Sequence, residues 1–97
     1  MTRSIHRGAE EDLTEAFRFY KREGGRGVAS RFLTEFERIA RLLEEHPGLG
    51  TPTSDGRRSF PLNHFPHSII YREEEGGIRV LVVRHQNRDP EHGEGRR

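Results

Sequence analysis

The sequence of residues 9–46, AEEDLTEAFRFYKREGGRGVASRFLTEFERIARLLEEH, contains two amphipathic patterns on either side of a glycine-rich break. In residues 9–23 the apolar side chains recur three and four positions apart, which predicts a helix with one apolar stripe. Residues 28–46 repeat this spacing. Acidic side chains open the first helix, where the helix dipole favours negative charge, and Gly24-Gly25 ends it. A connection of about four residues predicts an antiparallel helix hairpin.

The segment after the second helix predicts strands. Turn-forming residues fill 48–56, and three strand-like runs follow at 57–62, 65–72 and 78–84, with an acidic turn at 73–77. The run at 78–84 is the most apolar, so we expect it to be a central strand.

A short strand-like start at residues 2–7 completes the order β-α-α-β-β-β. We therefore expect an α+β fold in which the helix hairpin packs on one face of a small, mostly antiparallel sheet. Val80 and Val82 should contact Phe32, Phe36 or Ile39 across this interface. Nothing else in the chain is expected to cover the second face of the sheet.

Composition limits the class of protein. Ninety-seven residues fit one domain, predicted over residues 1–92, with a frayed tail at 93–97. The hydrophobic share is 30%, so the core must be thin and suited to completion by a partner. The absence of cysteine excludes disulfides and thiolate metal sites, and the net charge of +1 excludes a polycation. No membrane span or signal peptide is recognised, which predicts a cytoplasmic protein.

The ordered motifs resemble those of the RelE/ParE superfamily of type II toxin–antitoxin toxins. The resemblance spans nearly the whole chain and is closest to the ParE-like, or plasmid stabilisation, branch. The matching positions are Ala9, Asp12, Leu13, Tyr20, Phe32, Ile39, His46-Pro47-Gly48, Arg57-Arg58, Leu62, Phe65-Pro66, Ile69-Ile70-Tyr71, Val80, Val82, His85 and Arg88-Asp89-Pro90.

This resemblance implies a bacterial toxin that a cognate antitoxin, usually encoded in the same operon, neutralises. ParE-like members poison DNA gyrase, whereas RelE-like members cut mRNA on the ribosome. RNA-cleaving relatives carry two arginines and a tyrosine where this chain has Ser68, Gln86 and His92. The resemblance therefore favours a gyrase inhibitor that acts by binding. An mRNA interferase and a non-toxic family member remain the alternatives.

The candidate site residues follow from the basic side chains of the sheet region. The candidates for contacts with the target or the antitoxin are Arg57, Arg58, Arg79, Arg84, His85 and Arg88. Under the RNA-cleaving alternative, His85, Arg88 and His92 would supply acid–base chemistry and positive charge. His85 and Arg88 also have structural interpretations. His85 could bond the following loop, and Arg88-Asp89 could hold a C-terminal turn.

We expect neither a cofactor nor a metal ion. A zinc site built from His64, His67 and His92 is conceivable, but these residues lack the helical spacing typical of such ligands. His67 also stands where relatives have an aromatic residue after Phe65-Pro66.

Overall fold

A computed structural model describes residues 2–97. It has one long helical element, two short 3-10 turns and five strands. The elements in chain order are β1 (Thr2–Ile5), α1 (Arg7–Glu45), η1 (Pro47–Leu49), β2 (Thr51–Pro52), η2 (Ser54–Gly56), β3 (Arg58–Pro61), β4 (His67–Glu74) and β5 (Gly77–His85).

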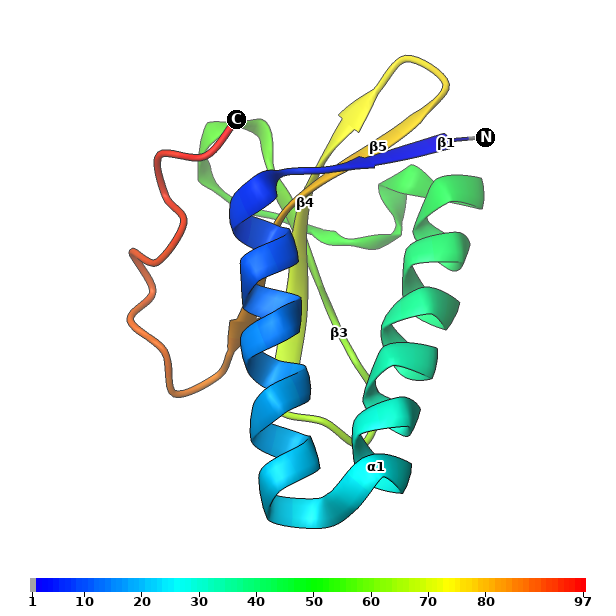
Figure 1. Cartoon of the computed structure of the whole chain (residues 1–97). Helices are drawn as coiled ribbons and strands as arrows, with labels where there is room; N and C mark the ends of the chain where they lie inside the picture. The colour runs from blue at the N-terminus through cyan, green and yellow to red at the C-terminus, as the bar shows by residue number, and fades with distance from the viewer. Residues whose placement is uncertain (1) are drawn as a thin grey trace.

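The helical part is a single element, α1, and not the two separate helices predicted at 9–23 and 28–46. Only Gly25, at φ 83° and ψ 175°, leaves helical geometry inside it. A straight helix of 39 residues would be about 58 Å long, whereas the longest dimension of the molecule is 37 Å. The kink at Gly25 therefore returns the chain along itself, and Figure 1 shows residues 7–24 (the first arm) beside residues 26–45 (the second arm).

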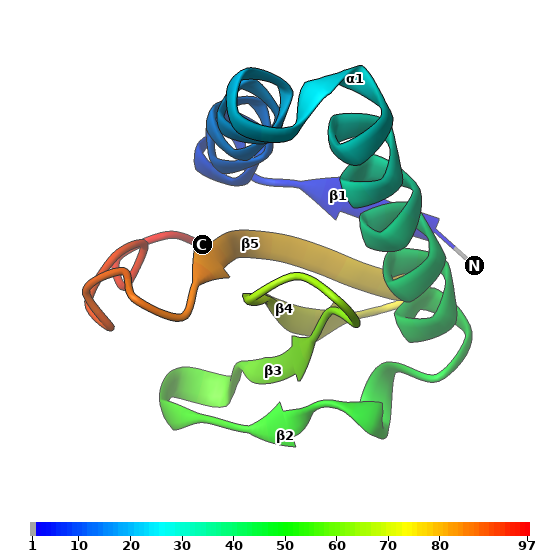
Figure 2. The same ribbon diagram turned by 90° about the horizontal axis from the view of Figure 1, so that it is seen from below.

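The strands form one mixed sheet in the order β1-β5-β4-β3-β2. Three neighbouring pairs are antiparallel, and β1 pairs in parallel with β5. β5 is an interior strand, as its apolar sequence predicts, although β4 occupies the middle position. Strand β2 is an addition to the predicted order. Figure 2 shows the strands stacked below the arms of α1. No helix within residues 2–97 is both long enough and apolar enough to cross a membrane.

A β-bulge in the hairpin of β4 and β5 decides which side chains face α1. Ile70 pairs with Val82 and Tyr71 pairs with Val80, so Leu81 has no partner in this register. The extra residue shifts the alternation of side chains between the two faces. Val80 consequently joins the main buried cluster, whereas Leu81 and Val82 join Ile70 on the second face. The prediction that Val82 contacts the helices is therefore wrong.

The main core lies between α1 and the sheet. Phe36 is 5% exposed, which confirms that the apolar stripe of the second arm is buried. The cluster of buried residues comprises Ala9, Ala16, Phe32, Phe36, Ile39, Ala40, Leu43, Leu62, Ile69, Tyr71, Ile78, Val80 and Val83.

The second face of the sheet has a cover of its own, in contrast to the prediction of a bare face. Residues 86–97, which we call the C-terminal strap, run over it on the side away from the second arm (Figures 1 and 2). A Cβ atom on Gly93 would lie 2.5 Å from Val82 Cγ2, so the strap backbone passes directly over Val82. Arg57 donates hydrogen bonds to the carbonyls of Gly93, Glu94 and Arg96. These bonds hold the backbone of residues 93–96 against the sheet.

Candidate functional site

A pocket of about 220 Å³ opens where the first arm of α1, the end of β5 and the strap meet. Its lining combines apolar side chains with carboxylates, histidines and an arginine. The lining residues are Asp12, Glu15, Ala16, Phe19, His67, Val83, His85, Arg88 and His92.

His67 forms the buried end of the pocket and is 7% exposed. Its ring centroid lies 5.0 Å from those of Phe32 and His85, and 5.8 Å from that of Tyr20. Burial, and next the nearby His85, lowers the pKa of His67 to about 4, although Asp12 acts in the opposite direction. The imidazole is therefore neutral at physiological pH. Its ring packs against Tyr20 and Phe32 as one more ring of the aromatic cluster.

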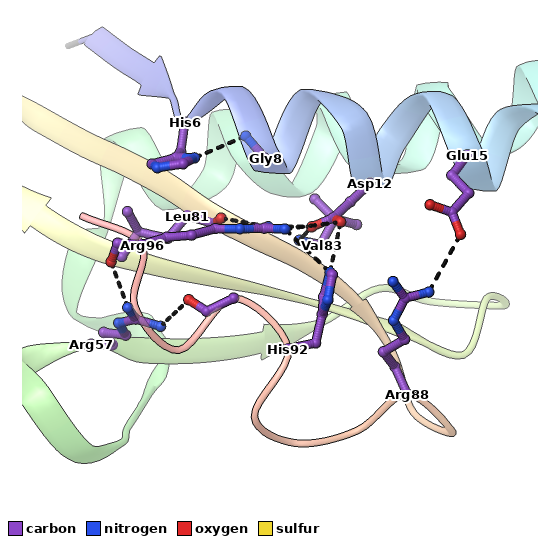
Figure 3. A network of polar contacts seen from close by, with 11 residues as sticks. His6, Gly8, Asp12, Glu15, Arg57, Leu81, Val83, Arg88, His92 and Arg96 are labelled. Carbon is purple, nitrogen blue, oxygen red and sulfur yellow. Dashed lines mark hydrogen bonds and ion pairs between the residues drawn. The ribbon is translucent and has the colours of Figure 1, made fainter.

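Asp12 connects the first arm to β5 and to the strap (Figure 3). Its carboxylate accepts a hydrogen bond from the backbone N–H of Val83 at 3.0 Å and from Arg96 Nη1 at 2.7 Å. His92 Nε2 lies 2.8 Å from Oδ1. Burial would raise the pKa of Asp12, but the bonds from Arg96, His92 and Val83 together hold it below its usual value. The carboxylate is thus charged and fully engaged.

Three of the predicted contact residues hold the strap. Arg57 binds three strap carbonyls, Arg79 Nε donates to Arg97 O at 3.1 Å, and Arg84 Nη1 donates to Pro90 O at 3.0 Å. Their donors thus point at backbone oxygens of the same chain.

Arg58 lies apart from this group. It pairs with Glu73 at 2.8 Å and donates to Gly50 O at 2.9 Å, beside the turn that follows α1. The six predicted contact residues therefore do not form one continuous basic surface.

His85 and Arg88 are the two predicted contact residues that reach the pocket. His85 Nδ1 accepts the backbone N–H of Asn87 at 3.0 Å, so part of its predicted role in the following loop is confirmed. Arg88 Nη1 lies 3.3 Å from Glu15 Oε1, and both side chains are well exposed. His92 lines the same pocket but is directed at Asp12 (Figure 3). The three residues of the RNA-cleaving alternative are therefore neighbours, with His92 already engaged.

Asp12, Arg96 and His67 were not predicted as site residues. Asp12 was predicted as an acid of the first helical turn and as a position that matches the family, but no binding role was assigned to it. Its spacing carried a signal nonetheless, because Ala9, Asp12 and Ala16 share one face of a helix and both alanines are buried. A carboxylate on a core-facing stripe needs a partner. Nothing in the sequence identified Arg96 as that partner, 84 residues away. Among residues 2–97, no three His, Asp or Glu side chains are grouped to hold a metal ion.

Comparison with known proteins identifies the family. A sequence model described as "ParE toxin of type II toxin-antitoxin system, parDE" matches residues 4–90. This chain belongs to the ParE toxin family. Toxin ParE2 of Mycobacterium tuberculosis, in strains CDC 1551 / Oshkosh and H37Rv, is 27% identical over 86 residues, covering 89% of this chain and 82% of the relative.

A solved structure supports the fold of this ParE-family chain. The structure titled "Chromosomal ParDE TA system from P. aeruginosa" superposes with a TM-score of 0.76 at 22% identity. The match covers 88% of this chain and 95% of the other. The α+β arrangement of a long helix and a five-stranded mixed sheet is thus shared with a protein from a ParDE system.

Proposed function

We propose that this ParE-family protein is a growth-inhibiting toxin that binds a protein target, DNA gyrase by family, and that a cognate antitoxin neutralises it. The proposed site of action is the cytoplasm. The observation that carries the proposal is the state of the basic side chains of the sheet region, which leaves His85 and Arg88 at the pocket. Arg57, Arg79 and Arg84 are bound to strap carbonyls, and His67 is buried and neutral. His85 and Arg88 remain as the contact residues at the pocket rim.

The exposed pair Arg88 and Phe19 suits protein recognition. Phe19 is 47% exposed, the Arg88 side chain is 46% exposed, and both line the pocket. Aromatic and arginine side chains dominate the binding energy of protein interfaces because each offers a large contact area and Arg adds directed hydrogen bonds. We propose that Arg88, His85 and Phe19 contact the target together.

RNA cleavage is the second candidate function, because His85, Arg88 and His92 line one pocket. Two observations weigh against it. His92 is bound to Asp12, and Ser68 and Gln86 supply no permanent charge to a developing phosphorane. Losing one preorganised charge-stabilising group typically costs about a hundredfold or more in rate.

A pair of assays separates the candidates. The wild-type protein should inhibit DNA supercoiling by gyrase and leave translated mRNA intact in a primer-extension assay. Arg88→Ala should weaken supercoiling inhibition about tenfold or more, as expected for a side chain at the centre of an interface. Arg31→Ala, an exposed arginine on the second arm, is the matched control and should behave as wild type. Codon-specific mRNA cuts that disappear in His92→Ala would establish the RNA-cleaving function instead.

We propose that the antitoxin binds the outer surface of α1. Leu13, Thr14, Phe17 and Leu33 line a groove between the two arms, and Leu33 is 39% exposed. An apolar groove between helices suits the apolar face of an amphipathic segment. The sequence favoured the uncovered sheet face together with the helix hairpin as the docking surface. Because the strap covers that sheet face, we propose the α1 part alone. Leu33→Glu should abolish co-purification with the product of the neighbouring small open reading frame, whereas Arg31→Ala should retain it.

A further inference from the structure

The C-terminal strap covers an apolar surface without contributing apolar side chains. Residues 86–97, QNRDPEHGEGRR, contain no aliphatic or aromatic residue apart from Pro90 and His92. Beneath them, Ile70, Leu81 and Val82 are at most 4% exposed. A segment without large apolar side chains gains little from burial, so its polar contacts must hold it in place.

Only two strap side chains point into the protein, and both end on one residue. Arg96 and His92 are 17% and 19% exposed, and each contacts the carboxylate of Asp12 (Figure 3). Arg96 Nη1 also donates to Leu81 O at 3.1 Å. Other bonds reach the strap from Arg57, Arg79 and Arg84, whose donors bind backbone oxygens, most of them of exposed residues. Gln86 N–H also donates to Pro66 O at 2.8 Å, and Arg88 pairs with Glu15 on the exposed surface.

The first turn of α1 is shaped around this contact. A Cβ atom on Gly8 would collide with the guanidinium of Arg96, so the absence of a side chain at residue 8 gives Arg96 its path to Asp12. Asp12 itself is 7% exposed, and a charge this deeply placed interacts strongly with its partners. Two residues of the helix thus fit the strap: Gly8 leaves space for Arg96, and Asp12 binds it.

We infer that Asp12 is a positioning residue: it docks the strap as a unit, and the docked strap holds His85 and Arg88 in their binding arrangement. The second part of this inference, that the docked strap positions His85 and Arg88 for binding, rests on the proposed function. Arg88 lies between β5 and the turn in which His92 N–H bonds Asp89 O at 2.9 Å. The exposed turn therefore depends on the anchor at His92 and Arg96 for a fixed position.

Strap docking can be measured directly by NMR on the full chain. In wild type, the Val82 methyl groups should show nuclear Overhauser contacts to Gly93. Asp12→Ala should remove these contacts and speed amide exchange at His92, Glu94 and Arg96 by about 10- to 100-fold, the effect expected for loss of charge-assisted hydrogen bonds. Asp12→Asn should fall between the two. Glu11→Gln, an exposed neutral-for-acid change one residue away, should match wild type.

Two further variants separate positioning from a general effect on folding. Gly8→Ala keeps the side chains of Asp12, His92 and Arg96 but forces the flexible Arg96 guanidinium to shift. It should therefore speed strap exchange, though less than Asp12→Ala does, while the urea midpoint of the core stays near wild type. In a double-mutant cycle, the effects of Asp12→Ala and Arg96→Ala on the amide exchange rates of the strap should be strongly non-additive. Unchanged strap exchange in both Asp12→Ala and Gly8→Ala would overturn the inference. If Asp12→Ala does not fold, Gly8→Ala and Arg96→Ala decide it.

The proposed positioning of His85 and Arg88 by the docked strap is tested with the same variants in the supercoiling assay. Asp12→Asn and Gly8→Ala should weaken gyrase inhibition about tenfold or more. In these variants the released turn has to become ordered on binding, which costs conformational entropy. Equal inhibition by wild type and by a variant with a released strap would refute the positioning role and leave the proposed function standing. Absence of inhibition by wild type would refute the gyrase target, and the NMR result would still decide whether Asp12 docks the strap.

Discussion

Replacement of His67 by phenylalanine should remove a specific part of the acid sensitivity of the fold. His67 titrates at about 4 in the folded protein against 6.5 in an unstructured chain. Between these values the unfolded state binds the proton and the folded state does not, so stability is fully present above pH 6.5 and is lost as pH falls. The difference in pKa corresponds to about 3 kcal/mol once both states are protonated.

The effect is measurable in a range where the carboxylates do not interfere. From pH 7.5 to pH 5.0, the His67 linkage should lower the free energy of unfolding by about 2 kcal/mol. Asp12, Glu35 and Glu37 have pKa values lowered from 3.8 or 4.5, so their contributions are lost only at more acid pH. Urea unfolding followed by circular dichroism at the two pH values gives the required free energies.

Phenylalanine suits the site because Phe32, Tyr20 and His85 already surround residue 67 with rings. His67→Phe should lose about 2 kcal/mol less than wild type over this pH range. His64→Asn, a change in an exposed loop at φ 69° where asparagine is well tolerated, should lose as much as wild type. Equal losses in wild type and His67→Phe would show that a buried, neutral His67 is the wrong reading.

Three further changes test the packing by urea unfolding or amide exchange. Phe36→Ala should lower the free energy of unfolding by about 3–5 kcal/mol, since it empties a 5% exposed site, and a change below 1 kcal/mol would contradict that burial. Tyr71→Phe should cost about 1–3 kcal/mol, because the Tyr71 hydroxyl donates to Pro47 O at 2.6 Å and its loss leaves buried polar groups unpaired. Gly77→Ala should cost about 1–3 kcal/mol and expose the amides of β1 to exchange, because its Cβ would collide with Thr2 O.

The helical pattern predicted α1 well, apart from the connection between its two arms. Apolar periodicity identified both arms, yet the predicted four-residue connection is a single non-helical residue. The glycine pair explains the difference. Gly25 takes the positive φ that reverses the chain, whereas a Cβ on Gly24 would lie 2.9 Å from Val28 Cγ2. One glycine therefore turns the chain and the other admits a close side chain, which composition alone does not reveal.

The strands were predicted by type more accurately than by pairing. The predicted acidic turn at 73–77 is shorter, because β4 extends to Glu74 and β5 begins at Gly77, with Gly76 at φ 78° in the turn. β2 has two residues, too few for any alternation to appear. The bulge opposite Ile70 and Tyr71 is set by the packing of both sheet faces, so alternation counted along one strand placed Val82 on the wrong side.

Two of the predicted contact residues line the pocket, but the contact of Asp12 with Arg96 was not predicted. His85 and Arg88 lie at the pocket, but the basic surface expected from six side chains is divided, because Arg57, Arg79 and Arg84 bind the strap. A hydrogen bond from a side chain to a distant backbone carbonyl leaves no pattern in the sequence of its acceptor. Long-range contacts of this kind need a structure.

The pairing of β1 with β5 affects when this protein can become active during its synthesis. Thr2 N–H donates to Gly76 O, and Asp12 accepts a hydrogen bond from Arg96. Residues near both ends of the sequence therefore complete the same fold. Contacts of such long sequence separation form late, because the chain must first pay the entropy of loop closure. A nascent chain that lacks its last dozen residues cannot assemble the pocket wall or fix its rim. The pocket wall can therefore form only once residues 86–97 have been synthesised and have docked on the sheet.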